Sequence, residues 1–526
     1  MPERNDAAAT ASTTPPPGWA VTDHDDPAVI SRQAHEDYTD HVVPLTARQS
    51  RLTVLGGWWS IASAMAFLYY GALAATLAGT RQALTGLVLV IVVYSLLGAV
   101  VSNASVVRGV NSMLLTREIF GVRGAALTPL ICGLGAIYYA VFESSVMASA
   151  LQAYFQVFDI RVWYAIVIVG MLPLMLGGMQ TWLNKLNNAT LPIYVCGVAA
   201  AVIVAGVRFG WSGDWFTAHP QPADTTIPGW LSTFVLFMGI WLLIPDTAEF
   251  ARFGRLRDKR FHSNVTFGWA FYLLAFGFNG VAGILIVALA APNTTIAESA
   301  VTTGIVASLG VVGLLVVIVS QIRINSANFY VASLCLERVA GHLFTRNLSR
   351  RAWVLLLAVI TFLLMLTKVF TYITTALAWQ GIITVAWVGI VTVHLLLVTA
   401  TPEIRSCRLT AVSRGLVIWA ISAAIGLVAM EFGVGMISSL APLIALLTSV
   451  VLYLTQVPAL RRGAHRPGDT DQRQSAGDLW STRIRCGCCG LHYTTYEMDT
   501  VPLQPDRPLC LECQPYPASR AAVPTQ

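Results

Sequence analysis

Twelve apolar stretches dominate this 526-residue sequence. In lipid, only an intact helix or a closed barrel satisfies the backbone polar groups, and a helix needs about 20 predominantly apolar residues to cross. Charged residues make up 11% of the chain, whereas soluble domains carry about a quarter, and the mean hydropathy is +0.65. The sequence therefore predicts an all-α integral membrane protein with twelve transmembrane helices, near residues 53–78, 84–106, 126–155, 162–179, 189–209, 228–245, 265–291, 302–334, 352–370, 375–399, 412–430 and 436–456.

Successive loops between these spans are alternately rich and poor in basic residues. The loops after the even-numbered spans hold Arg108, Arg117, Arg123, Lys185, Arg252, Arg255, Arg257, Lys259, Arg260, Arg338, Arg346, Arg350, Arg351, Arg405, Arg408 and Arg414. The other loops hold only Arg81, Arg161, Arg208 and Lys368. Basic residues mark the cytoplasmic side, so we expect a multi-pass protein of the cytoplasmic membrane with both termini inside. The net charge of +6 is modest, and the basic residues lie in short loops, where they set the orientation in the membrane. No nucleic-acid partner is therefore expected.

The chain divides by composition into four parts. Residues 1–50 are polar, rich in Ala, Thr and Pro, and lack the apolar core of a signal peptide, which predicts a mostly disordered cytoplasmic tail. Residues 51–458 form the twelve-helix domain, and 459–480 form a polar linker. Residues 481–526 form a small cysteine-rich module.

An arginine stands in the eighth predicted span, within "SQIRINSANFYVASL". Basic residues resume only at Arg338, about 15 residues after Arg323, or about 22 Å at 1.5 Å per residue. An arginine side chain does not snorkel over that distance. We therefore expect Arg323 to lie at depth and to face protein or water, which is a functional-site hypothesis.

Four segments occur in the order of a known family: "DYTDHVVPLTARQSRL", "LLTREIFGVRGAAL", "PDTAEFARFGR" and "INSANFYVASL". Over about residues 35–460 the chain resembles the nucleobase–cation symporter family of cytosine, purine, allantoin and hydantoin permeases. The resemblance implies a leucine-transporter-type fold, a five-plus-five inverted repeat followed by two helices. In such folds the substrate lies at the midplane beside interrupted first and sixth helices, here "GGWWSIASAM" and "FMGIWLLIPD".

The resemblance also implies a substrate site. Family members stack a planar heterocycle on aromatic rings of the third and sixth helices and bind its edge with amide side chains, which carry both a donor and an acceptor. Tyr138 stands where the family has tryptophan. The expected substrate-binding residues are Tyr138, Tyr139, Glu143, Trp241, Asn325, Asn328 and Ser63.

Two charges are predicted at depth, Glu143 and Arg323. We hypothesise that they are partners or face the same water-filled site, and that Glu143 marks a proton or substrate path; a purely structural buried pair is the alternative. Sodium-using family members place hydroxyl residues where Arg323 and Ile324 stand. Arginine has five donors and no acceptor, so Arg323 is expected to replace the cation. Transport should be sodium-independent, with proton coupling, uniport and exchange left open.

The C-terminal module contains Cys486-x2-Cys489 and Cys510-x2-Cys513. This spacing is typical of a four-thiolate zinc site, and disulfides are rare in the cytoplasm. We expect a zinc-ribbon-like module with structural zinc; a rubredoxin-like iron site is the second choice. Cys488 and His492 are alternative ligands.

The predicted function is a secondary active permease for a nucleobase or related planar heterocycle, with the lipid bilayer as its surroundings. A nutrient sensor signalling through the zinc-binding tail, which would also bind a cytoplasmic protein, and an amino-acid-type permease are the alternatives. The spans contain neither a His/Glu metal-ligand motif nor a serine nucleophile elbow, so no enzyme is expected.

Overall fold

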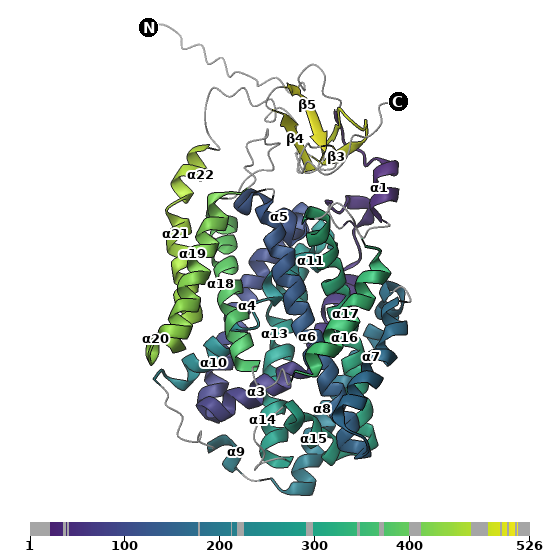
Figure 1. Cartoon of the computed structure of the whole chain (residues 1–526), viewed down its shortest axis with the longest axis vertical. Helices are drawn as coiled ribbons and strands as arrows, with labels where there is room; N and C mark the ends of the chain where they lie inside the picture. The colour runs from purple at the N-terminus through teal and green to yellow at the C-terminus, as the bar shows by residue number, and fades with distance from the viewer. Residues whose placement is uncertain are drawn as a thin grey trace, which may run out of the picture.

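A computed structural model describes residues 21–34, 38, 41–121, 123–176, 179–211, 213–217, 226–290, 298–343, 348–367, 373–398, 412–463, 482–494, 497–501, 504–510 and 513. A bundle of helices forms the body of the molecule, and a small β-module lies at one end of it (Figure 1). Of the predicted linker over 459–480, the structure describes only residues 459–463. Arg346, Lys368, Arg405 and Arg408 also lie outside the described residues.

Among the described residues, eight helical stretches are long and apolar enough to cross a membrane. They are Thr80–Arg108 (α4), Gly124–Phe155 (η3, Gly124–Ala126, and α6, Leu127–Phe155), Thr190–Phe209 (within α8, Met179–Phe209), Leu256–Ala290, Val311–Ala340 (within α16, Val311–Leu343), Thr375–Leu397 (within α18, Ile373–Leu397), Arg414–Phe432 (α19) and Ala441–Leu460 (α21, Ala441–Leu454, and part of α22, Val457–Gly463). The shorter apolar helices α7 (Ile160–Leu176) and α17 (Arg350–Met365) occupy the positions of the fourth and ninth predicted spans.

Two further spans are broken in the middle. The first comprises α2 (Arg51–Trp58), the 3-10 turn η2 (Ile61–Ser63) and α3 (Met65–Ala78), with a bend of 46°. The other comprises α10 (Gly229–Met238) and α11 (Leu243–Ala251), with a bend of 47°. These are the first and sixth spans, as the five-plus-five repeat implies, and the predicted all-α membrane fold is confirmed.

Two predicted spans differ in detail from the structure. The eighth, expected as one helix over 302–334, is split at Gly310, whose φ is +59°, into α15 (Glu298–Leu309) and α16. Hydropathy missed this break because both sides of it are apolar. The seventh contains η4 (Leu256–Asp258), α12 (Lys259–Phe261), α13 (Trp269–Tyr272) and α14 (Asn279–Ala290), interrupted by the π-helical segments His262–Thr266 (η5) and Leu273–Phe278 (η6).

Short helices connect or cap the spans. They are α1 (Pro27–Ala34), η1 (Leu45–Ala47), α5 (Ser112–Phe120), α9 (Asp214–Thr217) and α20 (Met436–Ser439). In Figure 1, α5 lies at the end of the bundle that carries the β-module, whereas α9 and α15 lie at the opposite end.

The β-module joins the two ends of the chain. Strand β1 (Val21–Thr22) pairs antiparallel with β2 (Arg483–Arg485), which pairs with β3 (His492–Thr494); β4 (Met498–Val501) and β5 (Gln504–Cys510) form a second antiparallel pair. Composition predicts a mostly disordered tail over 1–50, yet the structure describes β1, α1 and η1 within it. Composition missed β1 because its partner strand lies about 460 residues away in sequence.

Glycines let the first and seventh spans approach closely. A Cβ on Gly283 of α14 would lie 1.9 Å from the carbonyl oxygen of Leu68 in α3, and one on Gly71 would lie 2.4 Å from the Cα of Gly280. Small residues at helix interfaces bring backbones together in membranes. The broken first span is thus held against the seventh by backbone-to-backbone contact.

We predict that Gly283→Ala destabilises the protein, because the added methyl group meets a backbone atom that cannot move aside. Overpacking of this kind costs about 1–3 kcal/mol, and the Tm of the purified protein should fall by several degrees. Gly170→Ala is the matched control, since nothing lies within 4 Å of a Cβ there. Equal Tm values for the two variants would contradict the proposed close contact.

Candidate functional site

A cavity lies where the two broken spans meet α6 and α16. Its described lining includes Ala64 and Phe67 from the first span, Ile240 from the sixth, Glu143 from α6 and Asn328 from α16. The free volume is about 50 Å³, enough for a few water molecules, since one water needs about 10–15 Å³. This volume is smaller than a heterocyclic ring, so a ring-sized ligand requires the lining side chains to move.

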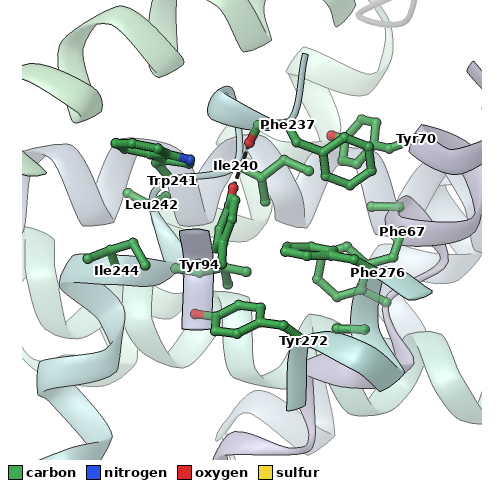
Figure 2. Close-up of a cluster of buried hydrophobic side chains, with 14 of the residues drawn as sticks. Phe67, Tyr70, Tyr94, Phe237, Ile240, Trp241, Leu242, Ile244, Tyr272 and Phe276 are labelled. Carbon is green, nitrogen blue, oxygen red and sulfur yellow. Dashed lines mark hydrogen bonds between the residues drawn. The ribbon is translucent and has the colours of Figure 1, made fainter. Parts of the chain in front are cut away.

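Side chains donate hydrogen bonds to backbone carbonyl groups at the two helix breaks beside this cavity. Asn279 Nδ2 of α14 donates to the Ala62 carbonyl at 2.7 Å, and Ser63 Oγ donates to the Ser60 carbonyl at 3.0 Å. In the sixth span, Tyr94 Oη of α4 donates to the Phe237 carbonyl at 2.6 Å (Figure 2). Membrane helices tolerate interruption only where such groups replace the lost helical hydrogen bonds.

Tyr139 supplies the aromatic ring that α6 presents to the cavity. Gln380 of α18 fixes it, because Nε2 donates to the Tyr139 hydroxyl at 3.3 Å and to the Gly239 carbonyl at 3.0 Å. Tyr138 is not in the lining; its ring lies T-shaped against that of Tyr139, with 5.2 Å between centroids. The sequence analysis missed Gln380, although a lone amide in "TALAWQGIITV" is a usable signal.

Trp241, expected as a stacking residue, is not in the described lining of the cavity. It is 2% exposed and packs edge-on against Tyr94, with ring centroids 6.2 Å apart (Figure 2). The neighbouring Ile240 lines the cavity instead. The chain leaves helical geometry between Met238 and Leu243, so helical periodicity could not predict which of these side chains faces inward.

The predicted polar residues divide into one that lines the cavity and two that support its walls. Asn328 lines the cavity, and its Nδ2 atom has no hydrogen-bond partner. Asn325 is fully buried and donates to Ser144 Oγ at 2.6 Å, joining α16 to α6. Ser63 serves the break in the first span and is not in the lining.

The hypothesised pair of Glu143 and Arg323 does not form in this structure. Glu143 is 1% exposed and lines the cavity, and neither carboxylate oxygen has a hydrogen-bond partner. Arg323 is not in the lining. Its Nη2 atom donates at 3.1 Å to the carbonyl of Trp59, in the break of the first span. The arginine is 2% exposed, so it is buried at depth as the topology predicts.

Asp246 is a cavity residue that the sequence analysis missed. It lies in the first turn of α11 and faces the same space as Glu143. Its Oδ1 atom is buried without a hydrogen-bond partner. In the sequence, Asp246 directly follows the apolar run "FMGIWLLIP". The predicted span ends at residue 245, so hydropathy places this aspartate in the following loop and not at the cavity.

The four predicted metal ligands come together in the β-module. The Sγ atoms of Cys486, Cys489, Cys510 and Cys513 all lie within 4.8 Å of one another. The backbone N–H groups of Cys488 and Cys510 donate to Cys486 Sγ at 3.4 and 3.3 Å. Hydrogen bonds from the Cys489 and Cys510 thiols, with weaker contributions from the backbone N–H groups of Cys510 and Cys489, hold the pKa of Cys486 well below its ordinary value. Four clustered sulfurs with amide donors suit a metal ion.

The alternative ligands lie outside this cluster. The Cys488 side chain is exposed, and the His492 imidazole lies 3.4 Å from Asp26 Oδ2. The apolar core of the module is small, consisting of Val29, Ile484, Tyr493, Met498 and Leu509 around the cysteines. A core of this size needs a metal or a similar crosslink to hold its shape.

The module is fastened to the segment that precedes the first span. Glu497 Oε1 accepts from the His41 ring at 2.8 Å and from the Val42 N–H at 3.2 Å, and both side chains of the His41–Glu497 pair are 3% exposed. Arg483 pairs with Asp25 at 2.9 Å. We call the contacts between residues 21–43 and the module the terminal clasp.

The same segment is fastened to the helix bundle. Arg48 donates to the carbonyls of Val43, Val106 and Gly254 at 3.0, 2.7 and 2.7 Å. Burial, with the nearby Arg483 charge, lowers the pKa of Arg48 to about 10, so it stays charged at neutral pH. The terminal clasp and the Arg48 bonds together therefore link the cysteine module to the start of α2, to the end of α4 and to the loop after α11.

Comparison with known proteins gives a likeness in structure. No family model matches the sequence, and no curated protein matches it. Mhp1, a nucleobase-cation-symport-1 family transporter, in a closed conformation with bromovinylhydantoin bound, matches with a TM-score of 0.63 at 13% identity over 83% of this chain and 98% of that one. Its inward-facing conformation gives 0.64 at 15% identity, over 83% and 96%.

A substrate-bound, outward-open Na⁺-coupled sialic acid symporter matches with a TM-score of 0.53 at 12% identity, over 77% of this chain and 90% of that one. At such identities the likeness establishes the fold alone. The chain is thus a multi-pass membrane protein with the fold that Mhp1 has, to which a cysteine-rich module is appended.

We predict that Glu497→Ala opens the terminal clasp, because it removes the acceptor shared by the His41 ring and the Val42 amide. Hydrogen exchange of residues 41–43 should accelerate at least about tenfold, since a buried charged acceptor contributes about 1.5–3 kcal/mol. Asp23→Ala is the control, because the Asp23 side chain is 79% exposed. Unchanged exchange in Glu497→Ala would contradict the clasp.

Proposed function

We propose that the protein is a secondary active transporter for a nucleobase or related planar heterocycle across the cytoplasmic membrane. The supporting observation is the cavity at the two helix breaks, where a fixed aromatic ring (Tyr139), an amide nitrogen without a hydrogen-bond partner (Asn328 Nδ2) and a buried carboxyl group (Glu143) meet. The ligand named for Mhp1, bromovinylhydantoin, contains a planar heterocycle of the same general shape.

The chemistry of these groups suits a flat ligand with a polar rim. An aromatic face attracts a ring through offset stacking, worth about 0.5–1.5 kcal/mol beyond area burial. The Asn328 amide offers donors and an acceptor in one plane, and Glu143 accepts from ring N–H groups. Sites near the midplane beside broken helices are typical of this architecture.

We further propose that transport is sodium-independent. Arg323 Nη2 reaches the Trp59 carbonyl in the first helix break at 3.1 Å, and a carbonyl of this kind is what a sodium ion would use as a ligand. The guanidinium has no acceptor atom and holds α16 to the first span. Proton coupling through Glu143, uniport and exchange all fit this arrangement.

The test is uptake of a labelled heterocycle panel into proteoliposomes with and without sodium. We expect wild-type uptake to agree within about twofold under the two conditions, because the cation is built in. Arg323→Ala should lose transport or become dependent on an added cation, whereas Arg161→Ala, which changes an exposed arginine, should behave as wild type.

Strict sodium dependence of the wild type would contradict the built-in cation and leave the heterocycle site standing. Binding without accumulation would contradict transport itself and favour the sensor. Uptake of free amino acids in place of heterocycles would favour the amino-acid-type permease.

We propose that the four clustered cysteines hold structural zinc. Purified protein should contain about one zinc per chain by elemental analysis, and Cys489→Ser should lose it, because a tetrahedral site needs all four ligands. Cys488→Ser is the matched control, since that side chain is exposed and outside the cluster. Iron with a visible absorption band would overturn zinc in favour of the rubredoxin-like site.

The orientation with both termini in the cytoplasm also stays a proposal. It is supported by the basic loops and by the position of both β1 and β2–β5 at one end of the bundle (Figure 1). The edge of strand β2 needs no partner protein to cover it, because the chain's own strand β1 pairs with it.

A further inference from the structure

Two carboxyl groups, and no basic side chain, belong to the described lining of the cavity. Glu143 comes from α6 and Asp246 from α11, so they approach the space from different helices. Both Glu143 oxygens and Asp246 Oδ1 are buried without a hydrogen-bond partner. An unpaired carboxylate in a low-dielectric site is costly, so each group requires a proton or a donor from a ligand.

The next acidic residue on α11 shows how the chain treats a carboxylate that has only a structural role. Glu249 lies one turn after Asp246, and its Oε2 atom is 3.2 Å from Arg338 Nη1 and 4.0 Å from Arg252 Nη2. Its Oε1 atom accepts from Ser112. Asp246 receives no such cations, although it lies on the same short helix.

The buried arginines nearby are committed elsewhere. Arg323 donates to the Trp59 carbonyl, and Arg338 and Arg252 surround Glu249. Only uncharged donors of the described residues lie near the two carboxyl groups: the Met65 and Ala66 N–H groups and Gln321 beside Glu143, and the Cys132 thiol beside Asp246. A positive charge for either carboxylate must therefore come from a proton or from what enters the cavity. The walls, which include Phe67, Tyr139 and Phe250, suit a planar cation, because aromatic faces attract cations.

We infer that the site selects a nitrogen heterocycle bearing an amidine or guanidine edge, as the cation or its donor-rich neutral form, and that Asp246 is a specificity-determining residue. This inference rests on the proposed transport of a heterocycle and narrows its substrate class. A protonated amino–imine edge, or the amino group and ring N–H of a neutral guanidine edge, presents two N–H donors side by side, which match a carboxylate in bidentate fashion. An oxo edge presents an acceptor to the same carboxylate and is rejected.

The same charges bear on the amino-acid alternative. A free amino acid brings its own carboxylate into a cavity that already contains two, and like charges at close range cost several kcal/mol. Arg323 is not in the described lining, so its charge is not placed to repel an ammonium group in the cavity. The cavity therefore excludes zwitterions by their carboxylate and admits compact cations.

The experiment measures binding to the purified full-length protein by two isosteric pairs, cytosine with uracil and 2-aminobenzimidazole with 2-benzimidazolinone. In the wild type, the amino member of each pair should bind at least about tenfold tighter than the oxo member. Asp246→Asn should reduce that ratio at least about tenfold without weakening the oxo member, because an amide can donate to a carbonyl. Asp159→Asn, at an exposed acid, should leave the ratio unchanged.

Equal affinity for both members in the wild type overturns the inference and leaves the proposed transport of heterocycles intact. Equal weakening of both members by Asp246→Asn also overturns it, because the aspartate would then be structural. If no member of either pair binds, the proposed function fails and the inference fails with it. The wild-type ratio decides the matter even if Asp246→Asn does not fold.

Discussion

The need to satisfy backbone polar groups away from water governs this structure. Two spans are interrupted at the level of the cavity, and each break frees carbonyl groups that lipid cannot hydrate. Tyr94 of the second span donates to the sixth at Phe237, and Asn279 of the seventh span donates to the first at Ala62. In a five-plus-five repeat the second and seventh spans are equivalent, so each repeat stabilises the break in the other.

A second pair of donors makes the breaks unequal. Gln380 of α18 serves the Gly239 carbonyl of the sixth span with a neutral amide, whereas Arg323 of α16 serves Trp59 of the first span with a charged guanidinium. A charged donor forms a hydrogen bond about twice as strong as a neutral one. The first break therefore carries a fixed positive charge, whereas the described lining of the cavity contains two carboxyl groups and no basic side chain.

Features that depend on hydropathy, loop charge or ligand spacing could be predicted from the sequence, and features that depend on the direction of a single side chain could not. The spans, the depth of Arg323 and the cysteine cluster belong to the first kind, because a rotation of a helix about its axis does not change them. Whether Tyr138 or Tyr139 faces the cavity depends on the rotation of α6 about its own axis, and whether Trp241 or Ile240 does depends on the non-helical turn between Met238 and Leu243. Asp246 was missed for the same reason, since the break moves the depth of the residues that follow it.

The terminal clasp was beyond the sequence because it joins segments about 460 residues apart, and its consequence is mechanical. Helix α2 has eight residues, too few to cross a membrane or to be stable alone, so its position depends on what holds its N-terminal end. Arg48 ties that end to α4 and to the loop after α11 through three carbonyls, and Glu497 ties the preceding residues to the cysteine module. Any outward displacement of α2 must break the Arg48 bonds or move the module with it. A movement of α2 is therefore mechanically coupled to the position of the cysteine module.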